Sequence, residues 1–359
     1  MKPLKILLGN ITLNFLGGSE TWTYTLATIL KKMGHRVNCF SPELGVFSSK
    51  LEKQEIRCFD KMSSGGIKPF TYILDENNID DYDIIISNHH QIVEYLREVF
   101  PKTPIISTVH GVIHFIDQEK GILAPEYPAL KSGVSQFVAV SEEVHDKLKN
   151  DYNLDSEIIR NFIDLDEFST KKPISDYPQR IFVNTNYNSK EDDEIKVIKE
   201  VADHYGAKLS AVGINFTPSL SVTKAIEDSD IVVGMGRSVL EGLAMGRLGI
   251  VHGRWGTAGV LHDDQSAFEM AHFNFSGRCL EGKQPIWTAE KLIEEIDKYY
   301  NKQTSDWSKD YIARHHNASL AAEKFIRIAR ELSGGIINDN KDQGRSPYIR
   351  AKDVAKGTS

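Results

Sequence analysis

Short apolar runs alternate with amphipathic stretches of helical period along the first half of the chain. Each run is continuously apolar and is bounded by loop residues, which is typical of buried parallel strands. The runs lie at residues 5–10, 36–40, 83–87, 104–110 and 136–141. Because parallel strands are joined by crossover helices, this alternation predicts a doubly wound α/β domain.

The same alternation begins again after a polar, proline-bearing stretch at residues 164–179. The new apolar runs lie at residues 180–185, 208–213, 230–234 and 249–253. Residues 288–333 have the apolar period of amphipathic helices, and no such period continues after Gly334. The pattern therefore predicts two Rossmann-like domains in tandem, followed by helices and a loose tail.

Composition and charge restrict the function. The 359 residues include 43 basic and 50 acidic side chains, for a net charge of -7, which argues against general affinity for nucleic acid. Three scattered cysteines fit a reducing compartment better than a disulfide framework or a zinc site. The apolar N-terminal stretch is too short to span a bilayer. We expect a cytoplasmic protein without a metal.

A glycine pair, Gly17 and Gly18, follows the first predicted strand and opens the next helix. Glycine lets a ligand approach the backbone closely, and the amides at a helix N-terminus attract anions. Ser19 and Glu20 are expected to cap this helix. The third glycine of a dinucleotide fingerprint is absent, and an ordinary turn with an N-cap accounts for the same residues.

A second glycine loop lies within residues 228–253, between a predicted strand and a helix. Gly236 permits close approach of a ligand, Arg237 can form a bidentate contact, and Ser238 is expected to begin the helix. These features suit a diphosphate. Glu241 could accept both hydroxyls of a ribose, or it could be an acid at the helix start that the helix dipole favours by roughly 0.3–1 kcal/mol.

Three segments, 17–37, 137–168 and 228–251, together resemble the GT-B glycosyltransferases, in particular the retaining family 4. The resemblance implies two Rossmann-like domains that face each other across a cleft. It implies an acceptor domain at 1–168, a donor nucleotide-sugar domain at 169–314, and a helix at 315–332 that crosses back to the first domain. Residues 334–359 would be a disordered tail.

The resemblance also assigns binding residues. Gly17 and Gly18 match the loop that approaches the donor phosphates, and Glu241 matches the second glutamate of the paired-glutamate motif, which holds the ribose. The first glutamate, which binds the transferred hexose in relatives, is missing, because only eleven positions separate Asp230 from Glu241. The resemblance therefore supports nucleotide binding more directly than sugar binding.

Three residues are expected to act in catalysis. The resemblance implies that Lys190 binds phosphate, although it could equally be a solvated residue at a helix start. Asn184 and Asn186 stand where an arginine is expected, and Arg237 could replace it electrostatically. His110, at the end of a predicted strand, could hydrogen-bond the donor sugar or the acceptor, or serve as a structural histidine.

The expected activity is transfer of a sugar from a nucleotide-diphosphate sugar to a glycan, a lipid-linked acceptor or a small molecule, with retention and without metal or cofactor. The alternatives are a non-hydrolysing nucleotide-sugar epimerase and a non-catalytic nucleotide-sugar-binding subunit. Residues 61–70 and 111–128 are candidate acceptor loops. Lys31 and Lys32, with Lys61 and Lys68, could contact an anionic membrane, which would place the protein at the inner face of that membrane. The oligomeric state is not predicted.

Overall fold

The computed structural model describes residues 2–15, 17–60, 82–112, 116–117, 122–123, 133–186, 188–190, 192–219, 221–253, 256–278 and 288–334. Four sequence expectations lie outside these ranges. They concern the tail after Gly334, the candidate acceptor loop at 61–70, most of the loop at 111–128, and Cys279.

The N-terminal domain is built on a seven-stranded parallel sheet with the order β3-β2-β1-β4-β5-β8-β9. Its strands are β1 (Lys5–Gly9), β2 (Arg36–Phe40), β3 (Arg57–Phe59), β4 (Ile84–Ser87), β5 (Ile105–Val109), β8 (Gln136–Ala139) and β9 (Ser156–Ile158). A separate antiparallel pair consists of β6 (Ile116–Asp117) and β7 (Ile122–Leu123). The strand order reverses beside β1, where doubly wound folds bind ligands.

Helices cover both faces of this sheet because successive residues of β1 point to opposite sides. Ile6 and Leu8 face one core and Leu7 faces the other. The first core includes α1 (Gly18–Lys32) and α2 (Val46–Glu52), and the second includes α4 (His90–Val99) and α6 (Glu142–Tyr152).

The C-terminal domain has a five-stranded sheet with the order β11-β10-β12-β13-β14, in which only the pairing of β13 with β14 is antiparallel. Its strands are β10 (Arg180–Asn184), β11 (Lys208–Val212), β12 (Ile231–Gly234), β13 (Leu248–Gly253) and β14 (Gly256–Leu261). Its helices are α7 (Asp193–Tyr205), α8 (Thr223–Glu227), α9 (Arg237–Ala244), α10 (Asp264–His272) and α11 (Ala289–Tyr299). α9 packs on one face of the sheet, and α7 and α11 pack on the other.

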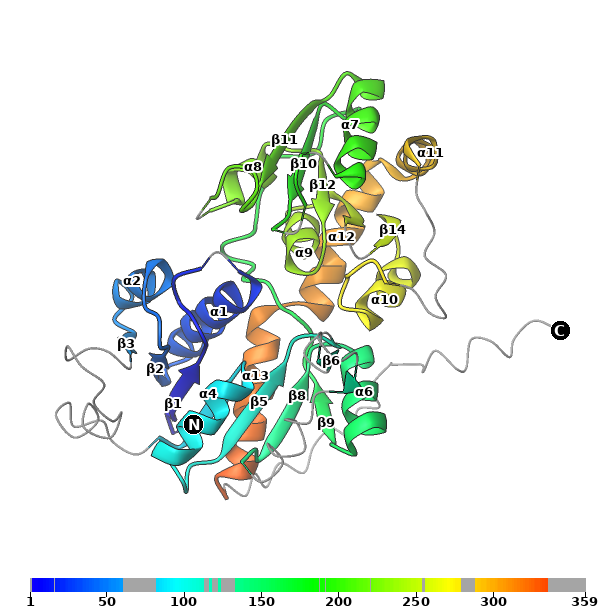
Figure 1. Ribbon diagram of the computed structural model, residues 1–359. Helices are drawn as coiled ribbons and strands as arrows, with labels where there is room; N and C mark the ends of the chain where they lie inside the picture. Colours follow the sequence, from blue (N-terminus) through cyan, green and yellow to red (C-terminus); the bar gives the residue numbers. More distant parts are fainter. Residues whose placement is uncertain are drawn as a thin grey trace.

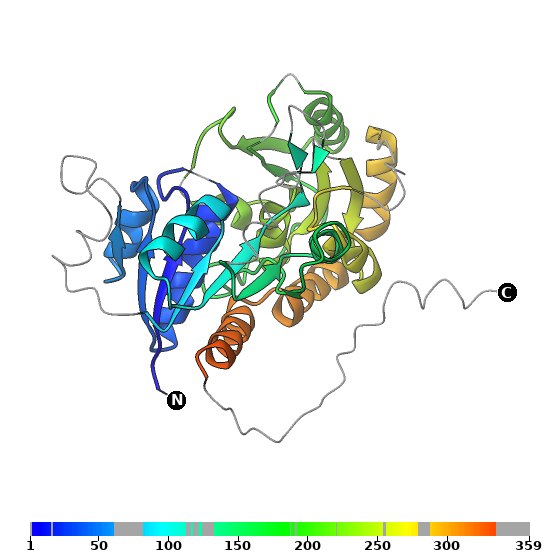
Figure 2. The ribbon, with the colours of Figure 1, turned by 60° about the horizontal axis from the view of Figure 1, so that its bottom comes forward.

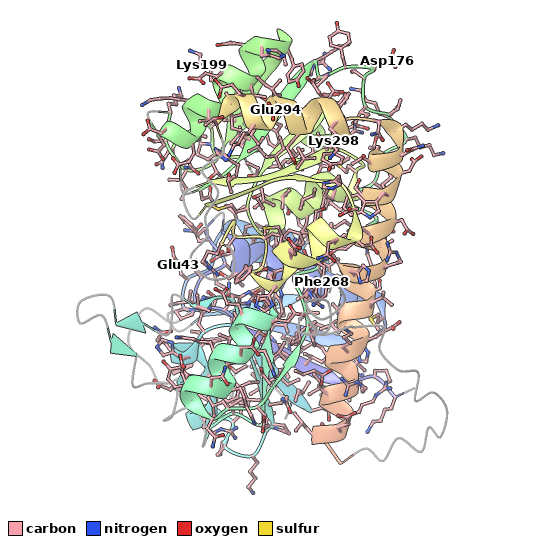
Figure 3. All side chains as sticks on the ribbon, turned by 90° about the vertical axis from the view of Figure 1, so that its right-hand side faces the viewer. Glu43, Asp176, Lys199, Phe268, Glu294 and Lys298 are labelled. Atoms are coloured by element: carbon pink, nitrogen blue, oxygen red, sulfur yellow. The ribbon has the colours of Figure 1, made fainter. Side chains whose placement is uncertain are left out.

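Two consecutive helices, drawn in orange, connect the domains (Figure 1 and Figure 2). α12 (Lys302–His315) packs in the C-terminal core, whereas α13 (Ala318–Leu332) packs in the N-terminal core against α1. Between them the chain forms a bridge from Asn317 to Ile163, at the point where it first leaves the N-terminal domain. Figure 3 shows both helices along one edge of the molecule. The chain therefore passes twice between the domains at the same place.

The predicted α/β fold with two parallel sheets is confirmed, and each predicted apolar run contains a strand. The expected cap of α1 is wrong in detail. Gly17 is the N-cap, no side chain caps it, and Ser19 lies inside the helix. The helical region at 288–333 is divided into three helices, because its polar turns at 300–301 and 316–317 start new ones.

Candidate functional site

A cavity of about 140 Å³ lies between the two domains. The start of α1, helix α2 and the segment that follows β9 line it from one side. The ends of β10 and β11 and the start of α9 line it from the other. Two helix N-termini thus reach one cavity, an arrangement that favours an anion.

Gly17 and Gly18 form the N-terminal wall of the cavity. A Cβ atom on Gly17 would lie 2.3 Å from a carboxylate oxygen of Glu20, whereas a Cβ atom on Gly18 would have no atom within 4 Å. Glu20 is buried beneath this loop, and burial raises the pKa of its carboxyl group. Gly17 therefore makes room for the Glu20 side chain, whereas Gly18 leaves open space at the N-terminus of α1.

Two glycines lie just before the opposite wall, although neither is among the residues that line the cavity. Gly236, the N-cap of α9, has a φ of +56°, a conformation that L side chains rarely adopt. A Cβ atom on Gly234 would lie 2.8 Å from the carbonyl oxygen of Asn184 and 2.9 Å from the Cβ of Ser238. Arg237 and Ser238 line the cavity directly after this turn. The glycine loop therefore brings the start of α9 close to the end of β10.

Arg237 reaches across from the C-terminal to the N-terminal domain. Its guanidinium donates to the carbonyl oxygen of Phe162 and, over 3.4 Å, to the hydroxyl of Thr25 on α1. It also lies 3.7 Å from a carboxylate oxygen of Glu241. Burial lowers the pKa of Arg237, while Glu241 and Glu167 act in the opposite direction. A fixed cation is thus held at the domain interface.

Glu241 is buried beside this arginine. Burial raises its pKa to about 7, and Glu167 adds to the increase, while Arg237 opposes it. The interpretation of Glu241 as an acid in the first helical turn is wrong, because α9 begins at Arg237 and its first turn contains no acidic residue. A buried carboxyl group that lines a cavity can instead bind a polar ligand.

Two charged residues of the cavity were not predicted. Glu167 follows β9, and burial raises the pKa of its carboxyl group. Lys50 on α2 lies 5.4 Å from the ring centre of Phe47 and 5.8 Å from that of Tyr24. α2 is too short for a clear apolar period, and Glu167 lies in a polar stretch, so no sequence pattern placed them in the site.

The other two predicted catalytic residues lie outside the residues that line this cavity. The His110 Nε2 atom lies 3.1 Å from the Oδ1 of Asn88, and its ring stands edge-on to Trp22, with 5.3 Å between centres. Its carbonyl oxygen accepts a hydrogen bond from Asn274 of the C-terminal domain. Lys190 is exposed just before α7. The structure therefore gathers Gly17, Gly18, Arg237, Ser238 and Glu241 around the cavity, but Gly236, His110 and Lys190 do not line it.

Neither a metal-binding cluster nor a membrane-spanning helix occurs within the described parts of the chain. No group of three or more His, Cys, Asp or Glu side chains there is placed to hold a metal ion. Among the same residues, no helix has both the length and the apolar character that crossing a membrane requires. Lys31 forms an ion pair with Glu55, and Lys32 forms ion pairs with Asp164 and Asp166.

Comparison with known proteins identifies the fold. Residues 16–167 match the model of Glycosyltransferase Family 4. No curated protein sequence matches the chain. A glycosyltransferase from Rickettsia africae is 18% identical, with a TM-score of 0.61 over 92% of this chain and 98% of its own.

Two further solved structures are similar over nearly the whole chain. HepE from Anabaena, in complex with UDP and glucose, is 12% identical, with a TM-score of 0.59 over 90% of this chain and 99% of its own. Sucrose-phosphate synthase from Thermosynechococcus elongatus is 11% identical, with a TM-score of 0.58 over 92% of this chain and 99% of its own. The predicted resemblance to family 4 is thus confirmed over residues 16–167, and the likeness to the solved structures shows that the chain has the GT-B fold.

Proposed function

We propose that the chain transfers a sugar from a nucleotide-diphosphate sugar to a glycan, lipid-linked or small-molecule acceptor, with retention and without metal or cofactor. The observation that carries the proposal is the interdomain cavity, where two helix N-termini meet Arg237 and the buried Glu241. UDP and glucose are bound in the HepE structure, which supports a nucleotide-sugar donor.

The diphosphate would lie between the start of α1 and the start of α9. Departure of a nucleoside diphosphate develops negative charge on its phosphate oxygens, and preorganised amides and a guanidinium stabilise such charge. The Arg237 side chain, which is 9% exposed, already lies at this place, and its guanidinium can contact the phosphates once the domains open. Lys50 adds a second cation from the N-terminal domain.

Glu241 would bind the ribose, because it lies one turn beyond the residues assigned to the diphosphate on the same helix. Its carboxylate can accept hydrogen bonds from both ribose hydroxyls. Lys190 and His110 remain predictions for the phosphate and the sugar or acceptor. Both lie outside the present cavity, so their participation would require the domains to move.

The cavity must widen before such a donor enters. Its volume of about 140 Å³ is below the range of roughly 300–1,000 Å³ that is common for ligand pockets. The contacts of Arg237 with Phe162 and Thr25 join the two walls, so domain opening would release Arg237 for the ligand.

A donor screen followed by a transfer assay tests the proposal. Thermal shift with a panel of nucleotide sugars names the donor, because a ligand that binds only the folded state raises the unfolding temperature. The purified chain is then incubated with that donor, with and without candidate acceptors. A glycosylated acceptor supports the proposal. Interconversion of the donor alone would indicate an epimerase, and donor binding without any reaction would indicate a binding subunit.

A further inference from the structure

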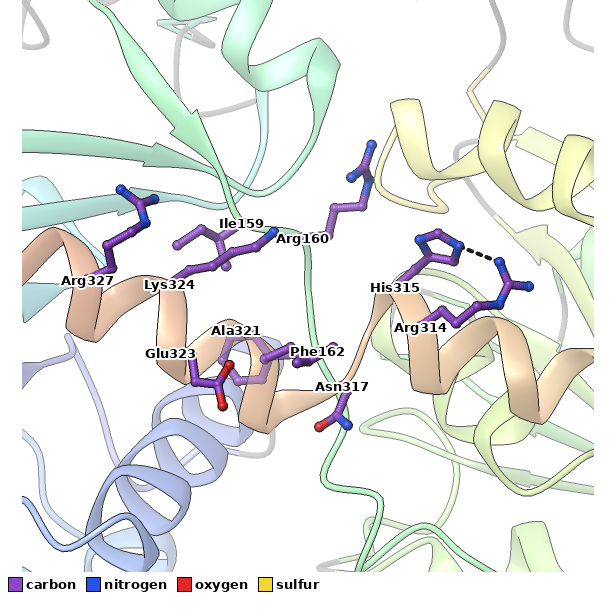
Figure 4. A pocket seen from close by; sticks show the side chains of 11 residues that line it. Ile159, Arg160, Phe162, Arg314, His315, Asn317, Ala321, Glu323, Lys324 and Arg327 are labelled. Atoms are coloured by element: carbon purple, nitrogen blue, oxygen red, sulfur yellow. Dashed lines mark hydrogen bonds between the residues drawn. The ribbon is translucent and has the colours of Figure 1, made fainter. Parts of the chain in front are cut away.

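A second cavity, of about 320 Å³, lies where the chain crosses between the domains (Figure 4). Its walls are the segment that follows β9, the end of α12 and the first two-thirds of α13. It shares no lining residue with the interdomain cavity described above. At about 30 Å³ for each water, it has room for on the order of ten water molecules, enough for a small ligand.

Basic side chains dominate the walls of this cavity. Arg160, Arg314, Lys324 and Arg327 line it, and Glu323 is the only acidic residue among its lining residues. In Figure 4, Lys324 points toward Arg160, whereas Glu323 points away from both. The cavity, which is open to solvent on one side, therefore brings several cations together.

The arginines are held in place by carboxylates outside the cavity. Arg160 pairs with Glu142, Arg314 with Asp264 and Asp310, and Arg327 with Glu157 and Glu331. Such pairs orient the guanidinium groups and partly offset their charge. A guanidinium has five donors, so an arginine in an ion pair can still contact a further anion.

Lys324 differs from the arginines. Within the part of the chain that the structure describes, no ion pair or hydrogen bond joins Lys324 to another residue. Desolvation by the surrounding protein lowers its pKa, and repulsion from Arg160 and Arg327 lowers it further, against the opposing effect of Glu157. The pKa of His315 is also lowered, by burial, Arg314 and Arg160. The local field is thus positive despite the carboxylates.

We propose that this cavity binds a small phosphate-bearing anion. Guanidinium groups match the geometry of phosphate oxygens, and Lys324 supplies a cation without a competing carboxylate. Arg314 belongs to the last turn of α12 in the C-terminal domain, whereas Lys324 belongs to α13 in the N-terminal domain. A bound anion would therefore contact both domains at their crossover. The phosphate could belong to a soluble ester or to a lipid headgroup.

Calorimetric titration of the full chain with inorganic pyrophosphate, at constant ionic strength, tests the proposal. Lys324→Gln keeps a polar side chain of similar helix propensity at this exposed position but removes its charge. We expect it to weaken the association that depends on this site by about tenfold, as for loss of one charge-assisted hydrogen bond. Lys324→Arg should retain binding.

Lys302→Gln is the matched control. Lys302 is an exposed lysine at the start of α12, on the order of 18 Å along the helix from Arg314. This variant should bind pyrophosphate like the wild type. Pyrophosphate that binds in the interdomain cavity instead would do so equally in the wild type and in Lys324→Gln. Identical titration curves for these two proteins would therefore overturn the proposal for a soluble ester. The vesicle experiment below then decides whether the site binds a lipid headgroup.

Vesicles distinguish the two sources of phosphate. The wild type and Lys324→Gln are sedimented with vesicles of phosphatidylglycerol or phosphatidylcholine. Sedimentation that requires both phosphatidylglycerol and Lys324 would identify a lipid headgroup as the source. If pyrophosphate binding depends on Lys324 but vesicle binding does not, the source is a soluble ester. If neither measurement depends on Lys324, the cavity does not bind phosphate.

Discussion

At the scale of single residues, Glu241 makes stability depend on pH. Burial raises its pKa to about 7 from the usual value of 4.5, so between these two pH values the folded state holds a proton that the unfolded state releases. The stabilisation from this proton is complete below pH 4.5 and is lost as the pH rises through about 7. Its size is at most about 3 kcal/mol, at 1.36 kcal/mol for each pKa unit.

Glu241→Gln should therefore flatten the decline in unfolding free energy between pH 5 and pH 8. Glutamine stays neutral at both pH values and pays no cost of ionisation in the buried site. Urea unfolding at the two pH values measures the effect. Glu294→Gln, on the outer face of the C-terminal domain (Figure 3), is the control and should keep the wild-type dependence. An unchanged decline in Glu241→Gln would show that Glu241 is ionised throughout this range.

Residues of the site were predictable only where they belong to a local motif. The glycine loops and Glu241 follow predicted strands, so their place at the carboxyl edge of a sheet follows from the topology. Glu167 and Lys50 come from separate parts of the chain, and only tertiary packing brings them to the cavity. The burial of Glu241 could not be predicted from its helix either. Water is excluded from this side chain by the surrounding domains and not by residues of its own helix.

At the scale of secondary-structure elements, one glycine from each loop allows effects on stability and effects on ligand binding to be tested separately. Gly236→Ala should lower the unfolding free energy by about 1–2 kcal/mol, because its φ of +56° is unfavourable for L residues. Gly18→Ala should preserve or slightly raise stability, because alanine favours a helix and meets no atom within 4 Å. Urea unfolding measures both.

Gly18→Ala also tests whether the nucleotide binds at the N-terminus of α1. The new methyl group of Gly18→Ala would enter the cavity, so nucleotide affinity should fall although stability does not. Wild-type affinity in Gly18→Ala would show that the donor does not approach α1. Calorimetric titration with a nucleoside diphosphate makes this comparison.

Long elements were predicted better than short ones. Central strands such as β1, β5 and β12 are continuously apolar, since both faces are covered. β3 and β9 have only three residues each and lie at the edges of the sheet, so they carry little apolar signal. The antiparallel strand β14 contains two glycines and was also missed.

At the scale of the whole molecule, the two chain crossings beside Ile163 and Asn317 define where the domains can bend. We expect the domains of the free protein to open about these crossings, which admits the donor, and the bound donor to draw them together again, because the proposed ligand contacts come from both domains. Solution scattering should show a smaller radius of gyration at saturating donor than without it. An unchanged radius under demonstrated saturation would contradict domain closure.

The central claim is that the cavity between the domains binds the donor nucleotide, with Glu241 on the ribose. The most direct measurement is the calorimetric affinity of the wild type and Glu241→Gln for UDP and 2′-deoxy-UDP, or for the corresponding pair if the screen names another base. The wild type should prefer the ribonucleotide, and Glu241→Gln should lose on the order of 1.5–3 kcal/mol of ribonucleotide binding together with most of this preference. Equal preference in the two proteins would contradict the assignment of Glu241 and remove the main residue-level support for a donor site in this cavity.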